Sequence, residues 1–385
     1  MSDKPSKSVT HCVSAQIGRD PGYGAVIPPL YLSSTYKFNG LDQMGPYDYG
    51  RGGNPNRDAL AETIATLEGG AGGVVTASGM AAIDLVLNLI KADQLVIAPH
   101  DAYGGTHRLL NSRQEQGRLR VRFIDQNDPD AVEAALLAKP ALFFIETPSN
   151  PLMRLVDIKA LSLAAKNAGA LVVCDNTFLS PARQTPLALG ADIVVHSTTK
   201  FLNGHSDVVG GVTIAKEAAM AEKLCWWANC IGVTGAPFDS YLTLRGLRTL
   251  HARLDIQEAN AIEIAHFLQH HPQVARVYYP GLPEDPGYAL AKSQQSGPGA
   301  ILSFELASNR DGVGRFVADT QLFQLAESLG GTESLICHPA SMTHRAMKEE
   351  ARQTAGISDS LLRLSVGLER SCDQIAELES LFAAL

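Results

Sequence analysis

The sequence lacks the features that mark membrane and secreted proteins. No apolar run approaches the roughly 20 residues that a membrane-spanning helix needs. The polar start, MSDKPSKSVTHC, has no apolar stretch of the kind found in secretory signals. The six cysteines are scattered without a Cys-x-x-Cys pair, which favours reduced thiols over a disulfide framework. We therefore expect a cytoplasmic protein with no membrane partner.

An excess of basic residues is also missing. The chain has 32 Lys and Arg against 40 Asp and Glu, a net charge of −8, which argues against nucleic acid as a partner. It has no Gly-x-Gly-x-x-Gly after a strand, no Gly-Lys-Ser/Thr phosphate loop and no His-Glu-x-x-His. His338 and His344 lack the usual spacing of metal ligands. We predict no metal site and no site of these nucleotide-binding types.

What the sequence does contain indicates two domains and an arm. A chain of 385 residues is long for one core, so two domains are expected. Residues 1–57 are rich in Gly, Pro and Tyr and show little periodicity, as in an extended arm with turns. We predict a ligand-binding domain over 58–250 and a smaller C-terminal α/β domain over 251–385. A long helical pattern, 240–271, leads into the second domain.

Short apolar runs alternate with helical patterns in the larger predicted domain. The runs cover residues 95–99, 121–125, 141–148, 171–176, 192–197 and 210–215, and amphipathic or apolar helices are predicted over 58–70 and 79–92. Most of the runs are apolar throughout, which is typical of strands buried on both faces of a sheet. Alternation of such strands with helices predicts the α/β class, with a mainly parallel sheet.

Polar side chains follow four of these strands where each strand ends. Tyr103, Asn150 and Asp175 follow three of them, and Ser197, Thr199 and Lys200 follow the fourth. Ligands of open α/β sheets bind beyond the carboxyl ends of the strands. Taken singly, each residue has an ordinary explanation: Asp175 as a turn residue, Tyr103 as packing, Lys200 as surface. Together they indicate a ligand site.

Pyridoxal phosphate (PLP) fits this set of residues. It needs a lysine for a Schiff base and a carboxylate to keep its pyridine nitrogen protonated. It also needs a ring to stack against and a phosphate cradle of hydroxyls and backbone N–H groups. The turn ASGMAAI supplies that cradle, because Ser78, Gly79 and Met80 open a helix whose N-terminus attracts anions. The sequence therefore predicts PLP as cofactor.

Nearly the whole chain resembles the Cys/Met-metabolism enzymes that use PLP, and within them the cystathionine γ-synthases most. The motifs that carry the resemblance are YGRGGNPNRD, ASGMAAI, APHDAYGGTHRL, ETPSNP, VVCDNTFLSP, HSTTKFLNGHSD, WWANCIGVTG, ESLGGTESL, HPASMTH and LLRLSVGLE. Asn56 and Phe201 depart from common family residues, at positions that carry no chemistry in the family. The resemblance implies an aspartate-aminotransferase-like (type I PLP) fold.

The resemblance also implies roles for the cofactor residues. Lys200 would hold PLP as an imine and move protons, and Asp175 would pair with the pyridinium nitrogen. Tyr103 would stack on the ring and assist at the leaving group. The phosphate would be bound by Gly79, Met80, Ser197 and Thr199, and by Tyr49 and Arg51 from a neighbouring subunit. A homotetramer is therefore expected, with a dimer as the alternative.

The family's substrate residues correspond to a second set. Arg363 would bind the substrate α-carboxylate with its bidentate fork, assisted by Asn150 and Ser328. Read alone, Arg363 is equally an ordinary arginine on the surface of an edge strand, and Arg51 a solvated one.

The type of reaction depends on further positions. Glu327 resembles the acid of members that act at Cγ, and Gly105 stands where methionine γ-lyases have a cysteine. Asp48 and Arg108 correspond to residues at the far end of the substrate, where an arginine suits a succinyl carboxylate; alone, Arg108 is equally a helix-surface charge.

These residues predict a γ-replacement. L-Cysteine would replace the succinate of O-succinyl-L-homoserine, giving L-cystathionine in the transsulfuration route to methionine. Three alternatives stay open: a cystathionine γ-lyase, an O-acetylhomoserine sulfhydrylase, and a non-enzymatic regulatory protein that binds PLP.

Overall fold

The computed structural model describes residues 4–345 and 347–385 and divides the chain into two compact units. The first unit combines Met1–Lys91 with Leu171–His251, and the second combines Ala92–Ala170 with Ala252–Leu385. Each unit is therefore built from two separate stretches of the chain. The arm and the two domains expected over 1–57, 58–250 and 251–385 stay a prediction.

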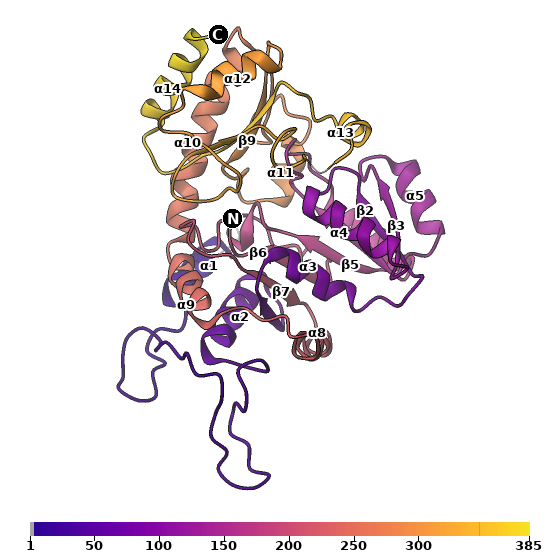
Figure 1. The fold of residues 1–385 in the computed structure, drawn as a ribbon, viewed down its shortest axis with the longest axis vertical. Coiled ribbons are helices and arrows are strands. Elements are labelled where there is room, and N and C mark those ends of the chain that lie inside the picture. The colour runs from indigo at the N-terminus through magenta and orange to yellow at the C-terminus, as the bar shows by residue number, and fades with distance from the viewer. Residues whose placement is uncertain (1–3, 346) are drawn as a thin grey trace. The chain divides into compact units, whose positions relative to one another are not determined.

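The first unit is a set of strands covered by helices (Figure 1). Its strands follow the order β1-β7-β6-β5, in which β6 and β5 are parallel and the pairs β1–β7 and β7–β6 are antiparallel. The elements are α1 (Lys4–Ser14), α2 (Pro55–Glu68), β1 (Gly72–Thr76), α3 (Gly79–Leu87), β5 (Leu171–Asp175), α7 (Ser180–Arg183), β6 (Ile193–Ser197), β7 (Gly211–Ala215), α8 (Ala218–Ile231) and α9 (Pro237–Leu247). Residues 15–54 form loops, which extend beyond α2 and α9 in Figure 1.

Local sequence explains where the helices of this unit begin and end. The Asn54 side chain accepts hydrogen bonds from the N–H groups of Asn56 and Arg57 and so caps the start of α2. Gly69 ends that helix in the left-handed conformation, with φ of 75°. Ser78 caps α3 by accepting from the N–H of Ala81. The chain therefore turns sharply from β1 into α3, at the motif expected to cradle phosphate.

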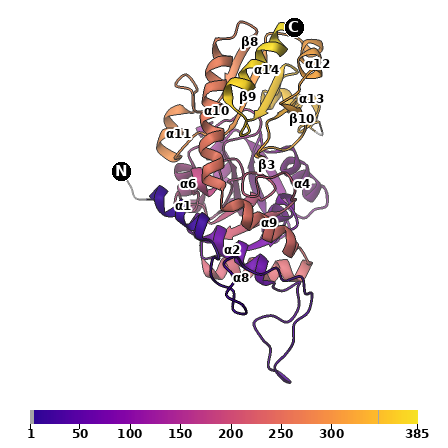
Figure 2. The ribbon, with the colours of Figure 1, turned by 90° about the vertical axis from the view of Figure 1, so that its left-hand side faces the viewer.

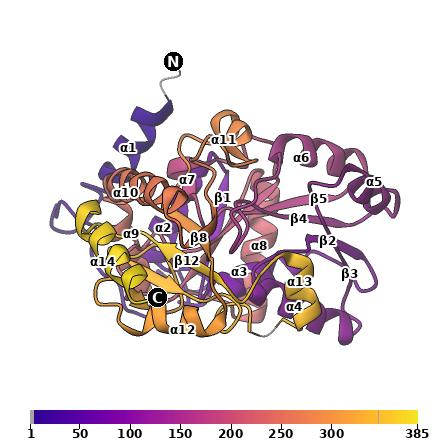
Figure 3. The same ribbon diagram turned by 90° about the horizontal axis from the view of Figure 1, so that it is seen from above.

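The second unit contains two sheets. In the first, β4 (Leu142–Glu146), β2 (Leu95–Pro99) and β3 (Arg120–Ile124) are parallel. Helices α4 (Gly104–Glu115), α5 (Pro129–Leu137) and α6 (Ile158–Asn167) connect or follow these strands. Figure 3 shows α4 on one face of the strands and α5 with α6 on the other, as right-handed crossovers require when the chain first moves outward and then back.

The other sheet of this unit follows the order β10-β11-β12-β9-β8 and is mostly antiparallel. Its elements are α10 (Leu250–His270), β8 (Val274–Tyr278), α11 (Tyr288–Gln294), β9 (Ile301–Leu306), α12 (Arg310–Ala318), β10 (Gln324–Leu325), β11 (Leu335–Cys337), α13 (Glu349–Ala355), β12 (Leu361–Ser365) and α14 (Ser371–Ala383). Helices α10 and α14 lie side by side in Figures 1 and 2.

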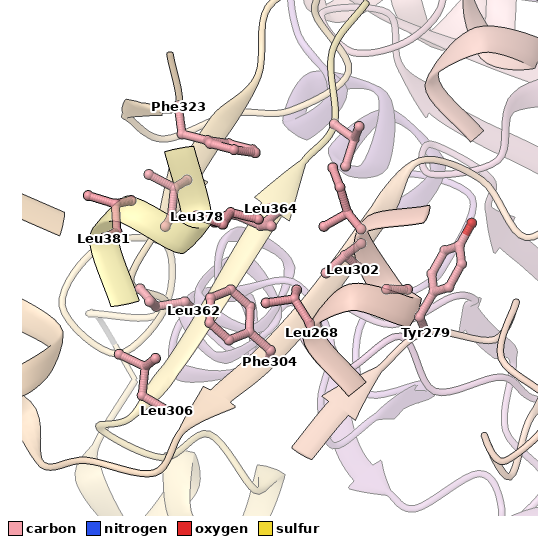
Figure 4. Close-up of a cluster of buried hydrophobic side chains, with 14 of the residues drawn as sticks. Leu268, Tyr279, Leu302, Phe304, Leu306, Phe323, Leu362, Leu364, Leu378 and Leu381 are labelled. Atoms are coloured by element: carbon pink, nitrogen blue, oxygen red, sulfur yellow. The ribbon is translucent and has the colours of Figure 1, made fainter. Parts of the chain in front are cut away.

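A hydrophobic core fills the space between this sheet and its helices (Figure 4). Leu302 and Phe304 of β9 and Leu362 and Leu364 of β12 are fully buried, with Leu378 of α14 in the same cluster. Alternate residues of β9 and β12 point to opposite faces, so this apolar set leaves Arg363 on the other face of β12. The core thus fixes the strand that carries the predicted substrate arginine.

The predicted fold class is confirmed: the chain has a large, mainly parallel sheet and a smaller second sheet with its own helices. Three details were wrong. Helix α1 and strand β1 were not predicted; β1 contains Gly72 and Gly73, which weaken a strand pattern. The helix expected over 240–271 is two helices, because the Thr249 N–H and hydroxyl both donate to the Gly246 carbonyl and close α9. No helix among the described residues is long and apolar enough to cross a membrane.

Candidate functional site

Asp175 and Ser197 lie at the ends of two neighbouring parallel strands of the first unit. Asp175 ends β5 and Ser197 ends β6, and the two strands pair with Asp175 opposite Val195. Thr177 joins them: its N–H donates to Asp175 Oδ1 at 2.9 Å, and its Oγ1 accepts from the Ser197 N–H at 2.9 Å. Because the Thr177 hydroxyl accepts from Ser197, its own proton is free to donate to the Asp175 carboxylate. The two strand ends are therefore held in register by one threonine.

The electrostatics of Asp175 suit a cationic partner. Burial raises the pKa of Asp175, while hydrogen bonds from Thr177 and the nearby His196 act in the opposite direction. A half-buried carboxylate in this position is stabilised as an anion by a positive charge. A protonated pyridine nitrogen supplies such a charge, so the Asp175 environment fits the predicted cofactor.

The start of α3 lies directly against Ser197. A Cβ atom placed on Gly79 would come within 2.7 Å of the Ser197 Cβ, so only glycine allows this approach. Gly79 and Met80 occupy the first turn of α3, where backbone N–H groups lack partners within the helix. These N–H groups, with the Ser197 hydroxyl beside them, form a cradle that fits a phosphate.

Lys200 lies in the turn that follows β6. Its N–H donates to the Ser197 carbonyl at 3.3 Å, and its own carbonyl accepts from the Gly204 N–H at 2.8 Å. The Thr199 Oγ1 accepts from the Gly210 N–H at 3.0 Å. The structure thus places Ser197, Thr199 and Lys200 in one tight, half-buried turn.

The arm residues lie together in the same unit. The Arg51 guanidinium is 5.4 Å from the centre of the Tyr49 ring, and its Nε donates to Asn229 Oδ1 of α8 at 3.0 Å. Asp48 is exposed and accepts from the Tyr49 N–H. Tyr49 and Arg51 are also exposed. Within one copy, these predicted phosphate ligands are thus held by the arm and by α8.

In the second unit, Arg363 is the centre of a buried polar group. It lies on β12, which has neighbours on both sides, and only 2% of its surface is exposed. Its Nη1 donates to Asn150 Oδ1 at 2.8 Å and its Nη2 to the Ser328 carbonyl at 2.7 Å. The interpretation of Arg363 as an exposed arginine on an edge strand is therefore wrong. The three residues expected to bind the substrate carboxylate are in direct contact.

The backbone at Ser328 is unusual. Its φ is 85°, in the left-handed region that non-glycine residues adopt at a cost of about 1 kcal/mol. This conformation accompanies the hydrogen bond from Arg363 to the Ser328 carbonyl. Strained residues of this kind cluster at functional sites.

Tyr103 belongs to the same unit and has charged neighbours. Its N–H donates to the Glu146 carboxylate at 2.9 Å, which fixes the start of α4 after β2. Burial raises its pKa, and the negative charges of Glu327 and Glu146 act in the same direction. Arg108 and Arg363 act in the opposite direction. Four of the residues predicted to contact substrate or its leaving group, Tyr103, Glu327, Arg108 and Arg363, therefore interact electrostatically within this unit.

Three residues near these groups were not predicted. Thr177 joins Asp175 to Ser197, Glu146 holds the Tyr103 backbone, and His344 lies beside Arg363. His344 is buried; burial first, and then the Arg363 guanidinium, lower its pKa to about 4. The sequence contained a signal for Thr177, which is the second residue after Asp175. Glu146 and His344 lie in the motifs ETPSNP and HPASMTH, but their contacts join distant parts of the chain, so no role could be assigned to them from the sequence. Among the described residues, no group of three or more His, Cys, Asp or Glu could hold a metal ion.

Comparison with known proteins agrees with a PLP-dependent enzyme. The sequence matches the Cys/Met metabolism PLP-dependent enzyme family over residues 9–383. The chain belongs to this family, and its cofactor is PLP. The family membership inferred from the motifs is therefore confirmed. It is an enzyme of this class, so the non-enzymatic alternative is wrong.

Relatives in the family carry more than one activity. The chain is 53% identical to cystathionine gamma-synthase of Escherichia coli strain K12, over 98% of both sequences. It is 45% identical to cystathionine beta-lyase of Lactococcus lactis subsp. cremoris, over 96% of this chain and 97% of the relative. A crystal structure of cystathionine gamma synthase from Xanthomonas oryzae pv. oryzae, in complex with cystathionine, matches with a TM-score of 0.97 and 53% identity, over 98% of each chain.

Proposed function

We propose that the protein is a cystathionine γ-synthase, which replaces the succinate of O-succinyl-L-homoserine by L-cysteine to give L-cystathionine. The observation that carries this proposal is the set of charges around Tyr103. Glu327 is the acid expected of enzymes that act at Cγ, and Arg108 is a cation for a carboxylate at the far end of the substrate. The 53% identity to a cystathionine gamma-synthase supports the same activity.

In this proposal one set of residues binds and operates the cofactor. Bound PLP supplies an electron sink for the charge that develops on the substrate carbons. Asp175 would keep the pyridine nitrogen protonated, while Gly79, Met80, Ser197 and Thr199 would bind the phosphate. Lys200 would hold the cofactor, and its amine, once free, would move a proton from the substrate Cα and one from Cβ and return them after the new bond to Cγ has formed.

A second set of residues holds the substrate. Arg363, with Asn150 and Ser328, binds the α-carboxylate through the fork of its guanidinium. Arg108, assisted by Asp48, binds the distal carboxylate of the succinyl group, and Tyr103 donates a hydrogen bond to the departing oxygen. The Cγ–O bond breaks, and succinate leaves with the bonding electrons. The L-cysteine thiolate then forms the new Cγ–S bond.

We also propose a cytoplasmic homotetramer in which the arm reaches a neighbouring copy. Large apolar side chains of the arm region are exposed: Ile17, Tyr23, Val26, Ile27, Leu30, Leu32, Phe38, Leu41 and Met44. Such a concentration of exposed apolar groups is typical of a protein–protein interface. Tyr49 and Arg51 lie in the same region. Binding of these two side chains to the cofactor phosphate of a neighbouring copy would explain why they are exposed in a single copy and why they lie in the arm.

A lyase is the second candidate, because a cystathionine beta-lyase is 45% identical over nearly the whole chain. Cystathionine γ-lyase and O-acetylhomoserine sulfhydrylase activities are the further alternatives. A substrate panel separates all four. The purified holoenzyme is assayed with O-succinyl- or O-acetyl-L-homoserine plus L-cysteine or sulfide, and with L-cystathionine alone.

We expect the highest kcat/KM with O-succinyl-L-homoserine and L-cysteine. Without cysteine, we expect slower release of succinate, 2-oxobutyrate and ammonia. A higher kcat/KM for cleavage of L-cystathionine would contradict the proposal, and the product, pyruvate or 2-oxobutyrate, would then identify a β-lyase or a γ-lyase.

A further inference from the structure

A buried pair of ionisable residues lies in the first unit, at positions to which no role has been given. Glu68 Oε1 and His196 Nε2 are 2.7 Å apart, and neither side chain has any exposed surface. Glu68 is the last residue of α2, and His196 precedes Ser197 on β6. The same Glu68 oxygen accepts from Asn176 Nδ2 at 2.8 Å. One carboxylate therefore contacts the residue after Asp175 and the residue before Ser197.

The alternation of side chains along a strand explains this arrangement. Successive residues at a strand end point to opposite sides. Asp175 and Ser197 are joined through Thr177 on one side. Asn176 and His196 are joined through Glu68 on the other. The ends of β5 and β6 are thus linked by two sets of hydrogen bonds. One set passes through Thr177 on the side of the predicted cofactor residues, and the other passes through Glu68 on the opposite side.

Fold stability alone is a poor reason for this pair. Glu68 lies at the C-terminal end of α2, where the helix dipole disfavours a negative charge. A buried ion pair is commonly no more stable than apolar residues of similar volume. In addition, Glu68 Oε2 and His196 Nδ1 have no hydrogen-bond partner within the described part of the chain. An ionisable pair with incomplete partners at a buried site indicates a purpose beyond packing.

A network of amides extends from the pair along the chain. Asn176 Nδ2 also donates to the Gln184 carbonyl at 2.8 Å, and Gln184 Nε2 donates to Asn176 Oδ1 at 3.1 Å. The Asn176 N–H donates to the Val195 carbonyl at 3.1 Å. Asn176 is therefore held from three directions, and the position of the preceding residue, Asp175, is restricted with it.

We propose that Glu68 and His196 are positioning residues that hold Asp175 and Ser197 in the geometry that binds PLP. The inference rests on the proposed roles of Asp175 and Ser197 toward the cofactor. Glu68 holds the two strand ends together through Asn176 and His196, and His196 also places a second polar group near the Asp175 carboxylate. Neither residue contacts the substrate in this proposal. Substitution of Glu68 or His196 should therefore lower the affinity for PLP more than it changes substrate binding.

The test measures cofactor binding rather than turnover. Apoprotein of the wild type and of Glu68→Gln is titrated with PLP, and the absorbance of the lysine-bound cofactor gives the dissociation constant. Glutamine keeps an acceptor for Asn176 but removes the charge. We expect the dissociation constant for PLP to rise about ten-fold, which corresponds to about 1.4 kcal/mol. The absorbance band of the bound cofactor should shift as well, because Asp175 is no longer held in place.

The chain offers a matched control in Glu62→Gln. Glu62 lies on the same helix, but it is 56% exposed and pairs with Arg19 at the surface. The same change there should leave the dissociation constant within about two-fold of the wild-type value, since exposed ion pairs contribute little. His196→Gln is the second test variant, and the double variant should lose no more than either single one, because the two residues act as a unit.

The result that overturns the inference is a Glu68→Gln or His196→Gln protein that binds PLP as the wild type does, whatever its thermal stability. A lowered melting temperature of the apoprotein with unchanged PLP affinity would assign the pair to folding alone. Asp175→Asn separates this outcome from a failure of the proposed site. If Asp175→Asn binds PLP normally while Glu68→Gln does not, the role of Asp175 is wrong and the pair acts through Ser197.

Discussion

The residues predicted to hold the cofactor and those predicted to hold the substrate are anchored in different ways. In the first unit, Asp175, Ser197 and Thr199 are fixed by short-range bonds to backbone groups and to Thr177, at strand ends and a tight turn. In the second unit, Arg363 is fixed by a side chain and a carbonyl from distant segments, Asn150 and Ser328. The residues predicted to hold the cofactor, which we call the cofactor group, depend on local geometry. Those predicted to hold the substrate, the substrate group, depend on tertiary packing.

This difference explains how relatives with different activities can share one fold. If strand ends and a helix N-terminus hold the phosphate and ring in this chain, we expect changes there to affect any reaction of the cofactor alike. Side chains such as Glu327 and Arg108 are exposed and can change without disturbing a strand. A synthase at 53% identity and a lyase at 45% are consistent with this division. Substitutions in the two groups should therefore have different effects on cofactor binding and on KM.

The largest effect is expected from Lys200→Ala, in the cofactor group. Without the amine, the protein loses both the covalent link to PLP and the base that moves protons, so turnover should fall at least about a thousand-fold. The absorbance of the lysine-bound cofactor should disappear from the spectrum. Lys216→Ala, at an exposed lysine just after β7, is the control and should resemble the wild type. Retained absorbance in Lys200→Ala would show that another group holds PLP.

Arg363→Lys should damage the substrate group and leave the cofactor group intact. Lysine keeps the charge but loses the fork that contacts Asn150 and Ser328, and it leaves buried acceptors unpaired. We expect KM for the amino-acid substrate to rise roughly 10- to 100-fold, with the PLP dissociation constant unchanged. Steady-state kinetics and a PLP titration of the same preparation measure both.

Arg315→Lys is the matched control for Arg363→Lys, because Arg315 is an exposed arginine on α12 of the same unit. It should change neither KM nor cofactor affinity. If Arg363→Lys weakened PLP binding as much as it raised KM, cofactor binding and substrate binding would not depend on separate groups of residues.

The sequence indicated the position of the cofactor group more directly than that of the substrate group, for the same physical reason. Strand ends, glycine turns and hydroxyl clusters are short-range signals, so Asp175, Ser197 and Lys200 could be proposed as site residues from their positions after predicted strands. Arg363 was ambiguous, because burial of β12 depends on a core formed by Phe304, Leu362 and Leu378, which are far apart in the sequence. The contact of Thr177 with Asp175 could have been predicted, because the two residues are close in the sequence. The contact between Glu68 and His196 could not, because 128 positions separate them.

His344 should give the second unit a pH dependence of its own. Its pKa in the folded protein is about 4, below the ordinary value of 6.5, since burial and Arg363 oppose a charge on the ring. Between these two pH values the unfolded chain binds the extra proton, so the free energy of unfolding should fall as pH falls from about 6.5 to 4. The loss attributable to this group is up to about 3 kcal/mol.

Urea unfolding of wild type and His344→Asn at pH 7 and pH 5 measures this contribution. The variant should be less stable at pH 7, because it leaves a cavity, but should lose less stability between the two pH values. His270→Asn, at a surface histidine at the end of α10, is the control and should keep the wild-type slope. An identical pH slope in His344→Asn and wild type would show that the imidazole does not resist protonation in the folded state.

The smallest effect is expected from Thr177→Val, which removes only the hydroxyl between Asp175 and Ser197. Valine keeps the shape and the backbone N–H bond to Asp175, but it leaves the Ser197 N–H without its acceptor. One such loss costs about 1–3 kcal/mol at a buried site, so PLP affinity should fall about ten-fold. KM should stay unchanged, the reverse of Arg363→Lys. Thr66→Val, on the exposed face of α2, is the control. A raised KM with normal PLP affinity would place Thr177 in the substrate group instead.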